Sequence, residues 1–172
     1  EKNDIIAHRF CIYYISSDVN LIKFMEAYMI TVSKDNTGDY TSIQEAVDAI
    51  SSSTVSETIF IKNGTYNERV EITHNNITLI GESMDNVIIT KDYYALMTMP
   101  DNTKRGTFRS YTFFVHANNF HAYNITFVNS SGFGTEVGQA IAVYAEGDNI
   151  TFKNCKLLVI RTLSLPVLSL LK

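Results

Sequence analysis

Short runs of β-branched and aromatic residues, separated by polar turns rich in Asn and Gly, dominate the chain from Ile30 onward. Between residues 66 and 73, apolar Val70 and Ile72 alternate with polar neighbours, as on a strand with one buried face. Such runs, bounded by turn residues, predict β-strands. We expect strands over residues 30–33, 58–62, 66–73, 76–80, 87–90, 108–117, 124–128 and 140–144.

One segment breaks this pattern and predicts a helix, from Thr41 to Ile50. Its apolar residues recur at i, i+3, i+4 and i+7, which gives a helix one apolar face. A capping box is available in two registers, Thr41 with Gln44 or Ser42 with Glu45. A lone amphipathic helix ahead of many strands suits a cap that covers the first strands and hides their edge.

The strands contain a repeat, the tripeptide Asn-Ile-Thr beginning at Asn76, Asn124 and Asn149. The spacings of 48 and 25 residues are close to multiples of one short unit, which favours a solenoid of stacked β coils. Chance recurrence in a β-rich chain is the alternative. In a solenoid, these three asparagines would stack as one amide ladder at one corner. They also form N-x-[ST] sequons, as do Asn63 and Asn129, but we favour the ladder over glycosylation.

Composition narrows the class of protein. The 172 residues suit one domain or part of one, and 10 Tyr with 10 Phe can build a core. A net charge of −4 argues against a nucleic-acid partner. Cys11 and Cys155 lie in unrelated contexts and give no disulfide framework. The apolar runs of residues 1–28 are too short and too interrupted to cross a membrane, and they lack the pattern of a secretory signal.

The most informative stretch runs from Gly106 to Val143, where a polar loop over residues 129–138 ends on Gln139. The sequences VSKDNTGDYTSIQEAVDAI, ETIFIKNGTYNERVEI, NITLIGES, GTFRSYTFFVHANNFHAYNITFVNSSG and GQAIAV resemble, in order and spacing, those of the pectin methylesterases. The resemblance covers Ile30 to about Leu158. It implies an all-β, right-handed parallel β-helix, here truncated, with one N-terminal capping helix. It also implies hydrolysis of galacturonate methyl esters in pectin, without a metal or organic cofactor.

Two residues match the family's functional positions. Thr107, in GTFRS, matches a substrate-contacting threonine. Gln139, in GQAIAV, matches a glutamine that binds substrate and helps to bear the negative charge developing on the ester oxygen. Such an amide works without titrating, as a preorganised donor. Lys104, Arg105 and Arg109 crowd Thr107, either as an attraction for anionic pectin or as a plain solvated cluster.

The resemblance also implies two catalytic aspartates, in G-x-Q-D-T-L and D-F-x-F-G segments, and neither segment occurs in these 172 residues. We therefore divide the chain into an unassigned segment, 1–28, an incomplete pectinesterase domain, 29–158, and an aberrant tail, 159–172. The tail VIRTLSLPVLSLLK admits codons that a one-base shift turns into G-Y-Q-D-T-L, so we hypothesise a frame shift.

Three functions follow from this sequence. The first is a pectinesterase whose chain, as given, is inactive alone, and the second is a non-catalytic β-helix that binds polysaccharide. The third, a pectate-lyase-like enzyme, would need clustered Ca²⁺ ligands that the sequence does not display. We expect a monomer that binds pectin, without nucleic-acid or membrane partners, and family resemblance implies secretion or a cell-wall location.

Overall fold

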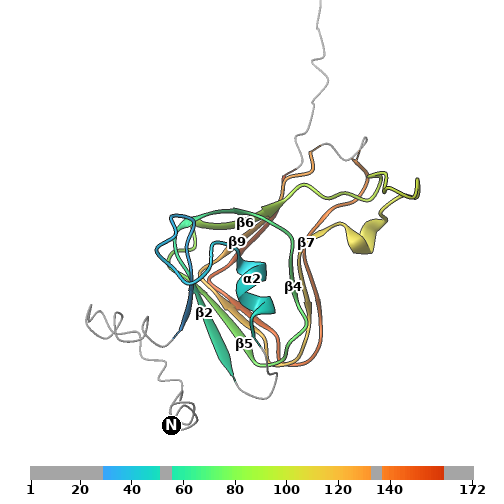
Figure 1. The fold of residues 1–172 in the computed structure, drawn as a ribbon. Coiled ribbons are helices and arrows are strands. Elements are labelled where there is room, and N and C mark those ends of the chain that lie inside the picture. The colour runs from blue at the N-terminus through green and yellow to red at the C-terminus, as the bar shows by residue number, and fades with distance from the viewer. Residues whose placement is uncertain (1–28, 51–55, 133–136, 161–172) are drawn as a thin grey trace, which may run out of the picture.

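Short parallel strands wind through three sheets in the computed structural model, which describes residues 29–50, 56–132 and 137–160 (Figure 1). The first sheet has the order β1 (Ile30–Val32), β2 (Glu57–Ile61), β5 (Ile77–Gly81), β8 (His121–Tyr123) and β11 (Thr151–Lys153). The second has the order β12 (Lys156–Val159), β9 (Thr126–Asn129), β6 (Val87–Lys91) and β3 (Gly64–Asn67). The third has the order β10 (Ile141–Glu146), β7 (Tyr111–His116) and β4 (Val70–Ile72).

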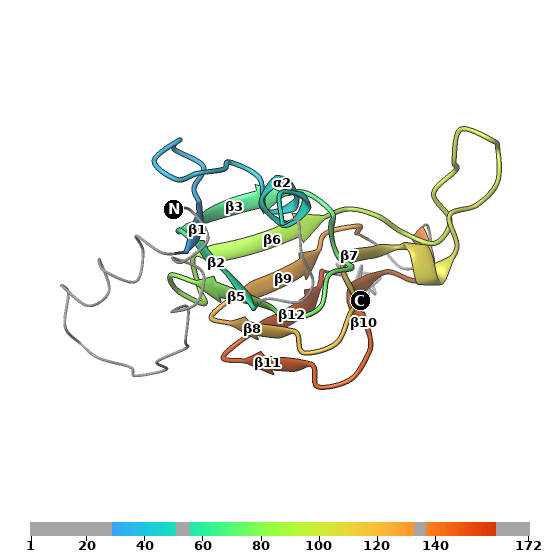
Figure 2. The same cartoon turned by 60° about the horizontal axis from the view of Figure 1, so that its bottom comes forward.

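Each coil takes one strand from each sheet in turn, so β5, β6 and β7 make one coil and β8, β9 and β10 make the next. The strands of successive coils pair in parallel, as β7 does with β4 and β10. Figure 2 shows the coils stacked on one another, with β11 at the far end from β1. The parallel β-helix expected from the sequence is confirmed.

The core lies inside the coils and follows the alternation of the strands. The apolar residues that point inward, such as Ile59, Leu79 and Ile89, are fully buried. Phe113 packs against Phe120 and Phe127, with ring centroids 5.7 and 4.7 Å apart. Burial of this kind contributes roughly 1.5–3 kcal/mol per large side chain, so the interior supplies most of the stability.

The helix expected near Thr41–Ile50 is present as α2 (Ile43–Asp48), and it closes the open end of the coils in Figure 1. Ser42 caps it by accepting a hydrogen bond from the backbone of Glu45, in the second of the two registers. The Gln44 amide accepts from the Glu71 nitrogen at 2.7 Å and donates to the Glu71 carbonyl at 3.3 Å. The helix thereby pairs with the outer edge of β4, which a solenoid must protect.

Asparagines with positive φ turn the corners, but the predicted single ladder is wrong. Asn119 donates to Asn76 at 2.9 Å and Asn149 donates to Asn119 at 2.8 Å, whereas Asn124 belongs to a second row with Asn154, at 2.7 Å. The reason is register: Asn76 and Asn149 precede strands of the first sheet, and Asn124 follows β8 at that sheet's other end. Rung spacings of 43 and 30 residues replace the expected regular unit because a long loop interrupts one coil.

Two predicted strands differ from the strands in the structure. The strand expected over residues 108–117 begins only at Tyr111, because Thr107–Arg109 form a 3-10 turn, η2. The predicted strand over residues 66–73 is two strands, β3 and β4. The last described coil leaves Leu157, Leu158 and Ile160 45–51% exposed.

The ends of the chain are described only in part. The unassigned segment 1–28 lies outside the described residues, as does 161–172, so the frame-shift hypothesis remains a hypothesis. Val159 ends β12, where it pairs with Asn129. Within the ranges that the structure describes, no helix has the length and apolar character needed to cross a membrane.

Candidate active site

Thr107 and Gln139, 32 residues apart in the chain, meet beside the first residues of β7 and β10. The Thr107 hydroxyl donates to the side-chain oxygen Oε1 of Gln139 at 2.9 Å. Gln139 is exposed and Thr107 is partly exposed, so a ligand can reach both. The structure thus brings together the two site residues predicted from the sequence.

Thr107 owes its position to a tight turn. Gly106 precedes it with a φ of 80°, a value that residues other than glycine rarely adopt. The Thr107 carbonyl then accepts two hydrogen bonds from Ser110, from the backbone nitrogen at 3.0 Å and from the hydroxyl at 2.6 Å. This closed 3-10 turn replaces the expected strand and presents the Thr107 side chain at the surface.

Gln139 is held from the other side by the loop of residues 92–106. The Ala95 nitrogen donates to the Gln139 carbonyl at 2.8 Å, and the Leu96 nitrogen donates to the Val137 carbonyl at 3.1 Å. Gly138 has φ of 73°, and a Cβ there would approach the Leu96 side chain to 3.1 Å. The amide therefore stands on a backbone that the neighbouring loop fixes, as preorganised catalysis requires.

Asn129 connects the pieces of the site from beneath, which sequence reasoning missed. Its fully buried amide nitrogen donates to three carbonyls, those of Tyr93 at 2.9 Å, Ser110 at 2.8 Å and Ile141 at 3.1 Å. These carbonyls belong to the loop, the end of the 3-10 turn and the start of β10. Because its amide is fully engaged, Asn129 positions the site and is no glycan acceptor.

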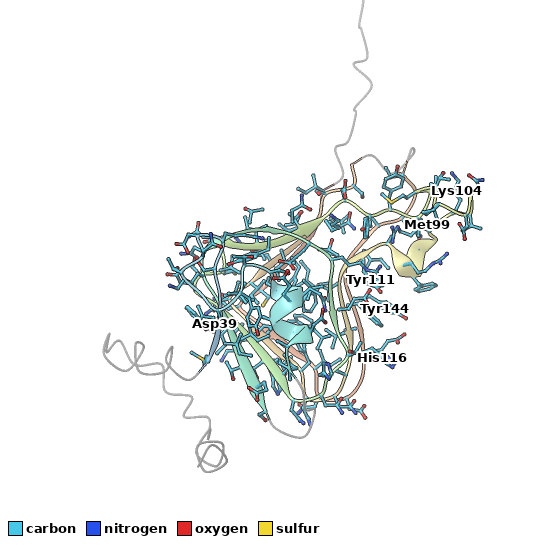
Figure 3. All side chains as sticks on the ribbon, in the orientation of Figure 1. Asp39, Met99, Lys104, Tyr111, His116 and Tyr144 are labelled. Atoms are coloured by element: carbon cyan, nitrogen blue, oxygen red, sulfur yellow. The ribbon has the colours of Figure 1, made fainter. Side chains whose placement is uncertain are left out.

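Of the three basic residues near Thr107, Lys104 and Arg109 are exposed, so only Arg105 departs from the solvated cluster considered from the sequence. Arg105 is 8% exposed and lies over the Tyr93 ring, 3.8 Å from its centroid. The Arg109 guanidinium donates to the Arg105 carbonyl at 2.6 Å and to the Lys104 carbonyl at 3.2 Å. Both arginines therefore brace the 92–106 loop, which projects from the body with Met99 and Lys104 toward its tip (Figure 3).

The outer face of the third sheet extends away from the site and carries aromatic residues that the sequence did not single out. Figure 3 shows Tyr111, Tyr144 and His116 along this face. Burial raises the pKa of Tyr111, and a hydrogen bond to Glu71 adds a smaller effect in the same direction. A hydrogen bond from Tyr144 lowers the pKa of Glu146, and the neighbouring His116 adds to the effect. Alternation along β7 places His116, which follows the buried Val115, opposite the core, whereas Tyr111 shares the parity of the buried Phe113 and could not be assigned to this face from the sequence.

The Thr107–Gln139 pair offers an uncharged hydrogen-bond donor. Because Thr107 occupies Oε1, the amide nitrogen Nε2 of Gln139 is left to donate to a ligand. Within the described ranges, no carboxylate is hydrogen bonded to either side chain, and no three His, Cys, Asp or Glu side chains gather closely enough to hold a metal ion. What these residues can do is bind an ester carbonyl and stabilise charge on its oxygen.

Comparison with known proteins shows the family of the chain. Residues 29–162 match the family described as Pectinesterase. The chain belongs to the pectinesterase family. Similar relatives include a probable pectinesterase/pectinesterase inhibitor 6 from Arabidopsis thaliana, 37% identical over 73% of this chain and 22% of the relative. Another is pectinesterase A from Dickeya chrysanthemi, 32% identical over 83% of this chain and 43% of the relative.

Solved pectinesterase structures share the fold. The pectin methylesterase PemA from Erwinia chrysanthemi matches with a TM-score of 0.71 and 30% identity, over 76% of this chain and 44% of that protein. A pectin methylesterase in complex with hexasaccharide VII matches with a TM-score of 0.69 and 31% identity, over 75% and 44%. The chain therefore spans less than half the length of these pectinesterases.

Proposed function

We propose that this chain forms the ester-binding side of a pectin methylesterase site, which hydrolyses the methyl ester of galacturonate units and releases methanol. The observation that carries the proposal is the hydrogen bond from Thr107 to Gln139, at 2.9 Å, which orients the amide nitrogen for donation. Family membership supports the same reaction. The proposal places the activity outside the cell, on the pectin of a cell wall.

Ester hydrolysis places negative charge on the carbonyl oxygen when a nucleophile adds to the carbon. A preorganised amide N–H beside that oxygen stabilises the charge without reorganising, and loss of one such donor costs about 10²–10³ in kcat. Gln139 supplies this donor in our proposal. Thr107 fixes the amide through Oε1 and contacts the substrate beside it.

Thr107 and Gln139 supply neither the nucleophile nor the acid/base group of this reaction. The resemblance to pectin methylesterases implies a nucleophilic aspartate and an acid/base aspartate, and the segments that carry them do not occur in the 172 residues. Stabilisation without a nucleophile gives little turnover. The 172-residue chain is therefore expected to bind methyl-esterified galacturonan and to release no measurable methanol from it.

The first experiment measures binding and methanol release together. Isothermal titration calorimetry with methyl-esterified oligogalacturonates should give binding to the 172-residue chain that Gln139→Ala weakens about tenfold, the cost of about one hydrogen bond. Gln139→Glu keeps an acceptor for Thr107 and removes the donor, so it should weaken binding at least as much. Thr107→Ser keeps the hydroxyl and is the matched control. Methanol release by the 172 residues would overturn the claim of inactivity, and unchanged binding by both Gln139 variants would overturn the site.

A second experiment separates the esterase from a non-catalytic polysaccharide-binding β-helix, which the exposed aromatic residues of the third sheet would also suit. The protein for this experiment is an extended version, in which Leu158 is followed by pectinesterase coils that contain the G-x-Q-D-T-L and D-F-x-F-G segments. The esterase proposal expects methanol release, with kcat about 100-fold lower for Gln139→Ala. A folded extended protein that binds pectin and releases no methanol would favour the binding protein.

A further inference from the structure

The asparagines of the N-x-[ST] sequons lie in very different surroundings in the folded chain. They are Asn63, Asn76, Asn124, Asn129 and Asn149. An N-linked glycan is bulky and hydrated, so it needs an asparagine nitrogen Nδ2 that is free to bear the sugar and an open surface beside it. These two requirements separate one of the five asparagines from the other four.

Asn76, Asn124 and Asn149 belong to the two asparagine rows at the corners, whose side chains hydrogen bond from coil to coil. Neighbouring coils are only about 4.8 Å apart, so a sugar on one of these side chains would crowd the next one. In the first two sequons the hydroxyl residue is also inaccessible, since Thr78 is 7% exposed and Thr126 is 5% exposed. The rows therefore argue against glycosylation at these three positions.

Asn129 is excluded by its hydrogen bonds and by its burial. Its Nδ2 already donates to three carbonyls, and the residue has no exposed surface. A sugar would replace one of the two Nδ2 hydrogens, so part of this network would be lost. It would also have to occupy the interior beneath the Thr107–Gln139 site.

Asn63 meets both requirements. It is exposed in the turn between β2 and β3, where the chain passes from the first sheet to the second. Its Oδ1 accepts from the Ser83 hydroxyl at 2.8 Å, and its backbone nitrogen donates to the Glu82 carboxylate at 2.7 Å. These contacts hold the residue while Nδ2 has no hydrogen-bond partner among residues 29–50, 56–132 and 137–160. Thr65, which supplies the hydroxyl of this sequon, is exposed as well.

We propose that Asn63 is an N-glycan acceptor, modified when the chain enters the secretory pathway. The sugar donor is a lipid-linked diphospho-oligosaccharide, and an oligosaccharyltransferase catalyses the transfer. The bond from Nδ2 to the sugar carbon C1 forms as the bond from C1 to the donor's phosphate oxygen breaks. The lipid diphosphate leaves with the bonding electron pair, and Nδ2 gives up one proton to a base of the transferase. The inference rests on the proposed function only for the extracellular location.

A glycan at Asn63 is compatible with the proposed ester-binding site. The corner between the first and second sheets lies opposite the third sheet, which carries the Thr107–Gln139 pair at its edge (Figure 1). The sugar would therefore leave that pair uncovered. Methyl-esterified oligogalacturonate should bind with equal affinity before and after the glycan is removed.

The 172-residue chain, secreted from yeast behind an appended signal peptide, tests the assignment. Peptide N-glycosidase removes the glycan and converts the asparagine that carried it to aspartate. Mass spectrometry of proteolytic peptides then measures the occupancy of each sequon, both in the medium and in the cells. We expect Asn63 to be occupied in most molecules and to exceed every other sequon in both fractions.

Variants of the Asn63 sequon distinguish this site from the others. Asn63→Gln and Thr65→Ala should each abolish the glycosidase-sensitive mass of the intact chain, whereas Thr65→Ser keeps a hydroxyl and should retain it. Asn149→Gln is the matched control and should leave that mass unchanged. An unoccupied Asn63 in both fractions, or a glycosidase-sensitive mass that persists in Asn63→Gln, would overturn the assignment. A glycan at Asn63 on a chain that fails to bind oligogalacturonate would refute the proposed function and confirm the acceptor.

Discussion

The inner and outer faces of the third sheet differ in burial, although both are formed by the same strands. Along β7, Phe113 and Val115 point inward and are fully buried, while Phe114 and His116 point outward, partly exposed and exposed. The inner rings pack on Phe120 and Phe127, and the outer ones meet Tyr144 and Tyr111. Aromatic residues therefore occur on both faces, and only their surroundings distinguish the buried rings from the exposed ones.

The difference shows how a solenoid separates stability from function. Parallel pairing through β4, β7 and β10 fixes which residues face inward, and the interior then requires apolar volume at each of these positions. No such requirement acts on the outer face. That face can therefore hold an amide, a hydroxyl and exposed rings in fixed positions at little cost to folding.

The largest expected effect comes from the inner face. Phe113→Ala removes a fully buried ring between two others and should lower the free energy of unfolding by about 3–5 kcal/mol. Phe114→Ala, one residue further along the strand, should lower it by about 1 kcal/mol or less. Urea denaturation of both variants measures the contrast. Similar losses for the two would mean that the outer rings are a second core.

A smaller loss is expected at Asn129, the last residue of β9, beneath the Thr107–Gln139 site. Asn129→Ala leaves the carbonyls of Tyr93, Ser110 and Ile141 without their shared donor and should cost about 2–4 kcal/mol. Asn129→Asp is the sharper companion, because it sets a carboxylate against the same three oxygens and should cost at least as much. Urea denaturation checks both, and an Asp variant as stable as wild type would contradict the role of Asn129 in joining these three segments.

The smallest effect is electrostatic and belongs to the outer face. The hydrogen bond from Tyr144 holds the pKa of Glu146 below its ordinary value, so its stabilisation is present above that ordinary value and is lost as the pH falls through the folded pKa. Glu146→Gln should therefore melt slightly below wild type near neutral pH, and the two should converge as the pH falls below the folded pKa of Glu146. If the difference in melting temperature between wild type and Glu146→Gln grew on acidification, Glu146 would not be stabilising in its ionised form.

The sequence predicted what depends on alternation and on local signals. Most of the strands, the capping helix and the meeting of Thr107 with Gln139 could be anticipated, while the sequence left both Thr41 and Ser42 open as the N-cap and did not predict β8, β11 and β12. Other features depend on which residues become neighbours across coils. The partner of Asn76 is Asn119 because a long loop shifts the register, and the rings of Phe114 and Tyr144 meet because β10 lies beside β7. Neither register is readable from one chain segment.

The contacts of the basic residues near Thr107 also depend on the fold. Next to Thr107 in the sequence, Arg105 and Arg109 resembled a patch for anionic pectin, but the structure turns both onto backbone carbonyls and one onto Tyr93. A charged side chain's destination depends on the acceptors that folding places near it. Asn129 was missed for the complementary reason, since its three acceptors come from three separated segments.

The central claim is that pectin binds on the outer face of the third sheet, at the Thr107–Gln139 end. Amide hydrogen exchange of the 172-residue chain, with and without methyl-esterified oligogalacturonate, tests it most directly because protection maps the contacted backbone. We predict ligand-dependent protection over residues 106–116 and 137–146, reduced in Gln139→Ala, with β2, β5 and β8 of the first sheet unchanged. Protection confined to the first or second sheet, or none at ligand concentrations that saturate calorimetry, would contradict pectin binding on this face.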